Sequence, residues 1–318
     1  MEYYPYLRGK QFELIALREM CTFMTNKDIV SPIIEPVKKG NTTLSKTIEC
    51  LKENDIDFNL IFNPQDGDHK KNDDEFDALV DFVLHITDGY DHFHPAFIID
   101  ESVNIAWIVD TISSRHLTNV TLIINQLTKD ETAIGLLLGT GVINRFVLSQ
   151  TDSSVRRLSR RFRTIGEVIM LEDKFNTKTK NADYATPEDE PFSEDHLFFR
   201  EEGYSGFADY LTIGNVYTDG GFLPYAVAIH LTYFEGDNIR VHHFVSDSND
   251  DNEDVPGKVE EALAKLVPFI DDRSMETIAC DQFRHIHSTG AYPGLGSIKK
   301  LSILNHIELV YDFFTRCR

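Results

Sequence analysis

The feature that most limits how this sequence can fold is a regular alternation of short apolar or β-branched runs with longer segments of helical spacing. The runs predicted as strands are residues 3–7, 29–37, 57–63, 96–100, 120–125, 145–150, 167–173 and 207–214. The helices predicted between them are residues 10–25, 41–54, 73–87, 102–116, 129–138 and 152–164. A repeated strand-helix unit is typical of a parallel sheet with right-handed crossovers.

The number of strands favours a closed sheet over an open one. We predict an α/β fold, a (β/α)8 TIM-like barrel with an added β-hairpin and C-terminal helices. Several strands are continuous apolar runs, as expected where helices cover the outer face of the sheet. An open doubly wound sheet is the alternative. No G-x-G-x-x-G follows an early strand, which disfavours the dinucleotide-binding form of that fold.

The pattern changes after residue 173. We predict that residues 1–255 form the barrel, with an acidic loop-like insertion at about 174–203 and a hairpin at about 224–246 whose turn uses Gly236. One hairpin strand is an alternative to 207–214 for closing the barrel. Residues 256–318 are predicted to be a helical segment packed on the barrel.

The charge balance excludes some partners. The chain has 31 basic and 52 acidic side chains, a net charge of −21, which opposes non-specific binding to nucleic-acid phosphates. No apolar run approaches the ~20 residues that span a bilayer, and the first residues do not resemble a signal peptide. We therefore expect a cytoplasmic protein with no membrane contact. The four scattered cysteines are expected to be reduced thiols.

Polar residues follow several of the predicted strands. In a parallel barrel the carboxyl ends of the strands meet at one mouth, where active sites lie. Opposed carboxylates there would suit acid/base hydrolysis, although such residues also commonly cap the following helix. The predicted catalytic residues are Glu35, Asp100, Asp173, Asp209 and His230, and the predicted substrate contacts are Arg8, Lys10, Asn63, Asn125 and Tyr210.

A metal site is the competing use of these residues. His230, His242 and His243 lie on the two arms of the hairpin, and Asp209 is a further donor. No HExxH or comparable ligand spacing is present, and His242 with His243 reads as an ordinary alternating strand pair. We predict no cofactor and leave a divalent metal open as the alternative.

The few basic residues are concentrated. Arg8 and Lys10 follow the first strand and could hold an anionic group at the mouth. A predicted helix carries a basic patch that could contact a nucleotide or nucleic acid, or could simply be a solvated face. The patch consists of Arg156, Arg157, Arg160, Arg161 and Arg163.

Two stretches resemble a known family. YYPYLRGKQFELIALRE followed by SPIIEPV, and GFADYLTIG with the later AVAIHLTYF and HHFVSD, resemble the bacterial and bacteriophage "beta family" proteins. The resemblance implies a barrel-type fold and occurrence in phages and bacterial defence loci, with no activity or cofactor to carry over. The matching positions are Arg8, Lys10, Glu35, Asp209, Tyr210 and His230.

Two functions from different classes remain open at this point. The first is a barrel hydrolase of a nucleotide or nucleic acid in phage-host conflict, with a glycosidic bond slightly preferred because the carboxylates lack metal spacing. The second is a non-catalytic recognition or partner subunit of a defence complex that docks onto a companion nuclease. Whether the chain is an enzyme is therefore uncertain, with a hydrolase favoured.

Overall fold

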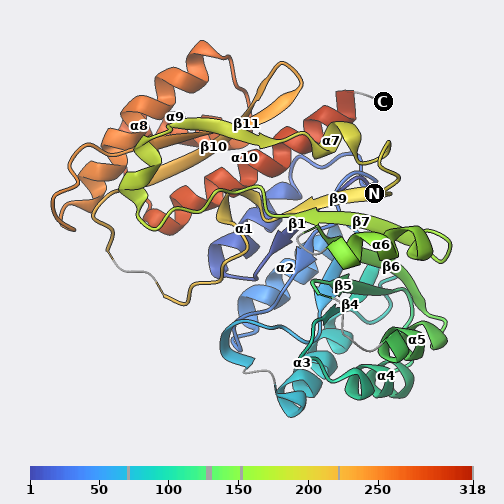
Figure 1. Ribbon diagram of the computed structural model, residues 1–318. Coiled ribbons are helices and arrows are strands. Elements are labelled where there is room, and N and C mark those ends of the chain that lie inside the picture. The colour runs from blue at the N-terminus through green and yellow to red at the C-terminus, as the bar shows by residue number, and fades with distance from the viewer. Residues whose placement is uncertain (70–71, 127–130, 151–152, 221–222, 317–318) are drawn as a thin grey trace. The chain divides into compact units, whose positions relative to one another are not determined.

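Eight parallel strands close into a barrel in the order β1-β2-β3-β4-β5-β6-β7-β9 (Figure 1). This computed structural model describes residues 1–69, 72–126, 131–150, 153–220 and 223–316. The strands are β1 Tyr3–Leu7, β2 Ile33–Ile34, β3 Phe58–Ile61, β4 Phe93–Ile99, β5 Val120–Ile124, β6 Ile143–Ser149, β7 Glu167–Glu172 and β9 Gly206–Asp209. The predicted (β/α)8 barrel is confirmed.

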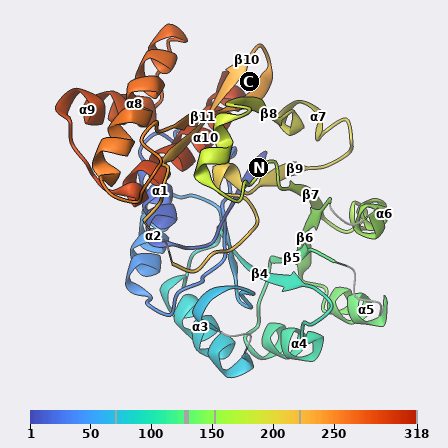
Figure 2. The same cartoon turned by 60° about the vertical axis from the view of Figure 1, so that its left-hand side comes forward.

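Helices alternate with these strands along the chain and surround them, as the view in Figure 2 shows for α3, α4 and α5. The helices are α1 Gln11–Met20, α2 Thr42–Glu53, α3 Asp73–Ile86, α4 Ile105–Ser114, α5 Glu131–Gly139 and α6 Ser153–Phe162. In an amphipathic helix, apolar residues recur three or four positions apart and form one buried face. Leu44, Ile48 and Leu51 of α2, for example, are all buried.

Several predicted strands are longer than the strands observed, and two of them differ most. The strand predicted at 29–37 is reduced to Ile33–Ile34, and the strand predicted at 207–214 ends at Asp209. The second one ends because Leu211 adopts a positive φ of 50° and starts the 3-10 turn Leu211–Ile213. Apolar residues continue past each strand, so composition alone overstates its length.

The chain forms two compact units. The barrel unit comprises residues 1–14, 25–172 and 198–209, and the second unit comprises residues 15–24, 173–197 and 210–318. The second unit contains the three-stranded antiparallel sheet β10-β11-β8, formed by Ala228–Glu235, Asn238–Val245 and Asp189–Ser193. Its other elements are the short helix α7 Asp195–Phe198 and the helices α8 Val255–Asp272, α9 Ile278–Thr289 and α10 Leu295–Arg316.

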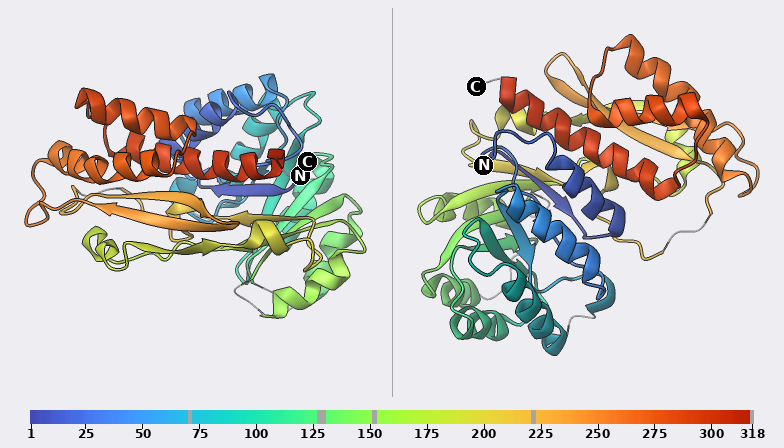
Figure 3. Two further views of the ribbon diagram at one scale, coloured as in Figure 1. Left: turned by 90° about the horizontal axis from the view of Figure 1, so that it is seen from above. Right: turned by 180° about the vertical axis from the view of Figure 1, so that it is seen from behind.

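The hairpin β10-β11 turns at Gly236, whose φ is +63°, as the sequence predicts. Figure 3 shows its strands running beside α10, and Thr232 of β10 accepts a hydrogen bond from Asn305 of that helix. The prediction of a loop at 174–203 is wrong for part of that range. Residues Asp189–Ser193 form β8, which pairs with β11 and extends the hairpin into a sheet. Among the described residues, no helix is both long and apolar enough to cross a membrane.

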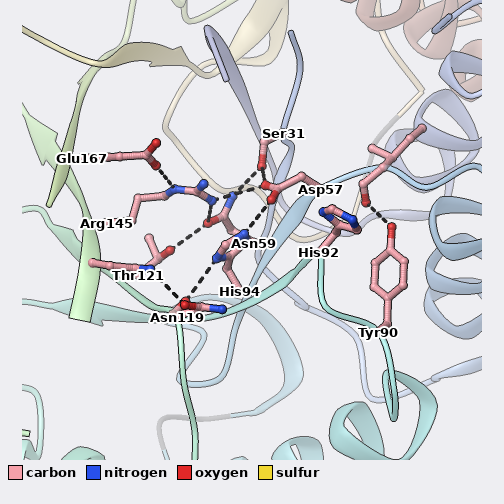
Figure 4. A network of polar contacts seen from close by, with 12 residues as sticks. Ser31, Asp57, Asn59, Tyr90, His92, His94, Asn119, Thr121, Arg145 and Glu167 are labelled. Atoms are coloured by element: carbon pink, nitrogen blue, oxygen red, sulfur yellow. Dashed lines mark hydrogen bonds and ion pairs between the residues drawn. The ribbon is translucent and has the colours of Figure 1, made fainter. Parts of the chain in front are cut away.

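A buried polar network fills the barrel interior near the amino ends of the strands (Figure 4). Asn59 of β3 accepts a hydrogen bond from Arg145 Nη1 of β6 at 3.0 Å and one from Thr121 Oγ1 of β5 at 2.8 Å. These strands are not neighbours of β3 in the sheet, so the bonds cross the interior. Asn59 Nδ2 donates in turn to Ser31 Oγ at 3.0 Å.

Asp57 is the centre of this network. It accepts hydrogen bonds from Ser31 and Arg145, and its carboxylate lies 2.6 Å from Nε2 of His94. Burial acts to raise the pKa of Asp57, but the His94 hydrogen bond and the Arg145 charge outweigh it and lower the pKa to about 2. Removing the negative charge would leave the buried Arg145 guanidinium with only the half-exposed Glu167 as its ionic partner.

We predict that Asp57→Asn lowers the free energy of unfolding at pH 7 by about 3–5 kcal/mol, the usual cost of breaking a buried ion pair from one side. Because the folded pKa of Asp57 is depressed, its contribution is present above the unfolded pKa of about 3.9 and is lost as pH falls toward 2. The difference in free energy of unfolding between the variant and the wild type should therefore become smaller in acid. Urea unfolding across this pH range measures it.

Asp55→Asn is the matched control, since Asp55 lies two residues away with a side chain that is 71% exposed. It should change stability by less than about 0.5 kcal/mol. An Asp57→Asn variant as stable as this control would show that the network does not hold the barrel together.

Candidate functional site

The interior face of each strand follows from the bonds that cross the barrel. Side chains two apart on a strand share a face, and paired residues of neighbouring strands face the same way. Since Asn59 faces inward and pairs with Ile33, which pairs with Tyr6, both of these side chains also face the interior. Glu35, two residues beyond Ile33, continues the inward series at the carboxyl end of β2.

Glu35 is 2% exposed and is held by two donors. The Tyr6 hydroxyl donates to Oε2 at 2.8 Å, and the backbone N–H of Gln65, in the loop after β3, donates to Oε1 at 2.7 Å. Arg8 follows β1, and its Nε lies 3.4 Å from Oδ2 of Asp66. These residues come from three successive strand ends, so they form one cluster at the mouth of the barrel.

Electrostatics distinguish the two carboxyl groups of this cluster. Burial raises the pKa of Glu35. The hydrogen bonds from Gln65 and Tyr6 and the charge of Arg8 lower it, but they do not offset the burial, and the neighbouring Asp66 raises it further. The Asp66 side chain is 36% exposed and paired with Arg8. A buried carboxyl group whose pKa is raised therefore lies near the partly exposed carboxyl group of Asp66.

A close backbone approach positions this cluster. Gly9 has a φ of +60°, and a Cβ built there would lie 3.0 Å from the carbonyl oxygen of Glu35. A side chain at this position would strain the backbone and crowd the end of β2, so the turn after β1 favours glycine here. The backbone N–H of Arg8 also donates to Glu13 of α1 at 2.7 Å, which fixes the start of the turn.

Asp209 lies on the opposite face of the sheet from Glu35. Ala208 pairs with the inward-facing Tyr4, so Asp209 points outward, where Tyr3 Oη donates to its Oδ1 at 2.9 Å. The Tyr3 ring also stacks on Phe207, with centroids 5.1 Å apart. The structure therefore does not bring Glu35 and Asp209 together, although the order of the strands suggests that they meet.

The remaining residues predicted at the mouth have local partners. Asn63 uses its amide to extend the β3-β4 ladder, since its Nδ2 donates to the Ile98 carbonyl and its Oδ1 accepts from the Ile98 N–H, both at 2.8 Å. Asp100 accepts from the N–H and hydroxyl of Ser102 in a tight turn. The backbone N–H of Asn125 donates to the carbonyl of Ile99, and Lys10 is partly exposed before α1.

Three predicted site residues belong to the second unit. Asp173 accepts from the backbone N–H groups of Phe175 and Asn215 and so holds a turn. Tyr210 is buried at the start of the 3-10 turn. His230 of β10 lies against His243 of β11, with their Nδ1 atoms 2.8 Å apart.

The basic patch is only partly within the described side chains. Arg160, Arg161 and Arg163 are exposed, whereas the side chains of Arg156 and Arg157 lie outside the described part of the chain. Arg163 donates to the carbonyl of Glu202 and lies over the Tyr204 ring, which gives it a packing role in the barrel unit. Nucleic-acid binding through this patch stays a prediction.

Over the described residues, no group of three or more His, Cys, Asp or Glu side chains is arranged to hold a metal ion. His242 and His243 point to opposite faces of β11, since His242 contacts Phe269 of α8 while His243 contacts Tyr184. Sequence reasoning missed Tyr6, Gln65 and Asp66. The only sequence signal for any of them was that Tyr6 and Arg8, two residues apart, would share one face of the first strand.

No protein-family model and no curated protein matches the chain. Solved structures give a general likeness. One is N-acetylneuraminate lyase from Mycoplasma synoviae, which is 13% identical in sequence. The match covers 65% of this chain and 68% of that chain, with a TM-score of 0.40. CdNal from Clostridium difficile in complex with mannosamine has 12% identity, 65% and 69% coverage and a TM-score of 0.42. N-acetylneuraminate lyase from Fusobacterium nucleatum has 10% identity, 66% and 69% coverage and a TM-score of 0.41.

The prediction of a nucleotide or nucleic-acid hydrolase is not borne out, since the similar structures that are named by an activity are N-acetylneuraminate lyases. The alternative of a defence-complex subunit gains no support from them either. At these identities and TM-scores the likeness does not carry the lyase activity to this chain. The function has to be argued from the site itself.

We predict that Glu35→Gln increases stability relative to the wild type as pH rises. The folded pKa of Glu35 is raised, so its contribution is present below the unfolded pKa of about 4.3 and is lost as pH rises through the folded pKa. Glutamine keeps an acceptor for the Gln65 N–H and carries no charge at any pH. Melting temperatures of both proteins from pH 4 to pH 9 measure the difference.

Glu101→Gln is the control, because Glu101 is exposed just beyond the carboxyl end of β4. Its melting temperature should follow the wild type at every pH. A Glu35→Gln curve that runs parallel to the wild-type curve would mean that Glu35 does not titrate with a raised pKa.

Proposed function

We propose that the barrel is an enzyme that transfers protons to and from a small molecule bearing a carbonyl group at the mouth formed by Tyr6, Arg8, Glu35, Gln65 and Asp66. The observation that supports it is the nearness of a buried Glu35, whose pKa is raised, to the partly exposed carboxyl group of Asp66. Two carboxyl groups whose environments differ in this way can act as acid and base.

Each residue has a separate task in this proposal. Protonated Glu35 donates its hydrogen to the carbonyl oxygen as negative charge develops there, a use of a neutral carboxylic acid known from other proton-transfer sites. Asp66 accepts a proton from the neighbouring carbon. Arg8, beside Asp66, adds a positive charge that favours an anionic substrate such as a 2-oxo acid.

Tyr6 and Gln65 position the acid. Their donors hold both oxygens of Glu35, so the carboxyl group has one orientation. When Glu35 is protonated, the Tyr6 hydroxyl can turn to accept its hydrogen. A bound substrate oxygen can then replace the Tyr6 hydroxyl as the acceptor.

We predict that the protein catalyses exchange of carbon-bound hydrogen for deuterium in pyruvate or another small 2-oxo acid in D2O. Glu35→Gln and Asp66→Asn should each lower the exchange rate by about 10²–10⁴-fold, the usual contribution of a general acid or base. Loss of the methyl proton signal in ¹H NMR measures the rate.

Glu101→Gln should exchange at the wild-type rate, since the same substitution is made at an exposed position. Absence of exchange with every 2-oxo acid tested would contradict the proposal. So would exchange that persists at the wild-type rate in Glu35→Gln.

A further inference from the structure

Two histidines and a glutamate form a continuous hydrogen-bonded chain in the second unit. His243 Nε2 lies 3.2 Å from Oε1 of Glu190, and His243 Nδ1 lies 2.8 Å from Nδ1 of His230. The other oxygen of Glu190 accepts a hydrogen bond from Asn176 at 3.0 Å. The three groups come from β8, β11 and β10, so the sheet itself brings them together.

The hydrogen bonds determine which ring nitrogens carry hydrogen. An ionised carboxylate only accepts, so His243 Nε2 donates to Glu190. A neutral imidazole has one N–H, which leaves Nδ1 of His243 as an acceptor. The facing Nδ1 of His230 must then be the donor, and the Nε2 atom of His230 is left with an unshared electron pair.

The surroundings keep both rings neutral. Burial lowers the pKa of His230 well below its ordinary value, and the neighbouring His243 and Lys299 lower it further. Burial also lowers the pKa of His243, against the opposing effect of Glu190. Tyr184 packs on both rings, with centroids 4.5 Å from His230 and 4.8 Å from His243. The Tyr184 hydroxyl accepts from the N–H of Lys178.

We propose that Glu190, His243 and His230 form a hydrogen-bonded relay that leaves His230 Nε2 as the acceptor for a small anion that bears a hydroxyl group, in a site of the second unit. His230 is half-buried and Lys299 is exposed. The ligand hydroxyl donates a hydrogen bond to Nε2, and the hydrogen bonds along the relay to Glu190 hold this acceptor in place. Lys299 attracts the anionic group. The relay has the carboxylate-imidazole order of a catalytic triad, with a second imidazole in the last place.

The first test determines the tautomer. Long-range ¹H–¹⁵N NMR at pH 7.5 should show His230 with hydrogen on Nδ1 and none on Nε2, assigned by loss of the signals in His230→Gln. His243→Asn keeps an acceptor at the same place and should preserve this tautomer. His243→Phe keeps the ring volume without the acceptor and should move the hydrogen to Nε2. A wild-type His230 with hydrogen on Nε2, or on both nitrogens, would overturn the proposal.

The second test measures the base and its ligand. Diethylpyrocarbonate modifies unprotonated imidazole, and a histidine of ordinary pKa near 6.5 loses about tenfold in rate between pH 7.5 and pH 5.5. Free N-acetylhistidine gives that reference. His230 should lose less rate than this reference, as followed by peptide mass spectrometry, because its pKa is lowered. An equal tenfold loss, or no modification of His230 at either pH, would overturn the proposal.

Glycolate and acetate then separate the ligand classes, because they differ only in the hydroxyl group. Glycolate should slow the modification of His230 more than acetate at the same concentration, and Lys299→Gln should remove the protection. Equal protection by the two anions, or no protection by glycolate, would contradict the assignment of a hydroxyl-bearing anion.

Discussion

The inward direction of alternate side chains around the closed barrel is the constraint on which the rest of the structure depends. The hydrogen bonds from Arg145 and Thr121 to Asn59 cross the interior and so define one face of every strand through the register. A slip of one residue at β2 would turn Glu35 out of the interior and Ile34 into it. The buried polar network therefore determines, at the other end of the strands, which side chains can meet at the mouth.

The two ends of the barrel each hold a buried carboxyl group, and their neighbours give them opposite properties. Asp57 receives a direct hydrogen bond from His94 and the charge of Arg145, so it is ionised even in acid. Glu35 receives neutral donors, and the nearby Arg8 is shared with Asp66, so burial prevails and its proton is retained to higher pH. The amino end of a barrel commonly contributes stability and the carboxyl end chemistry, and the charges here fit that division.

The fold could be predicted because a strand-helix repeat limits the topology, whereas the site depended on facts that one sequence does not display. The inward face of β9 is set by the pairing of Ala208 with Tyr4, and only that pairing shows that Asp209 points outward. Asp66 and Gln65 lie in a loop after β3, beyond any periodic pattern. β8 lies in a polar, acidic segment with few apolar residues, so its pairing with β11 had no local signal.

The histidines of the hairpin illustrate what pattern alone can establish. Adjacent positions on a strand face opposite sides, so His242 and His243 could be separated from the sequence. The contact of His243 with His230 follows from the hairpin register, but its contact with Glu190 needs β8. Distant segments determined the chemistry in both units of the molecule.

The protonation state of Glu35 tests the central claim most directly. ¹³C NMR of protein labelled at glutamate side-chain carbons, with Glu35 assigned by its loss in Glu35→Gln, gives the pH at which this carboxyl group ionises. We predict a midpoint above the ordinary glutamate pKa of about 4.3. A midpoint at or below that value would mean that Glu35 is an ordinary carboxylate at neutral pH, and the proton-transfer site at the barrel mouth would have no acid.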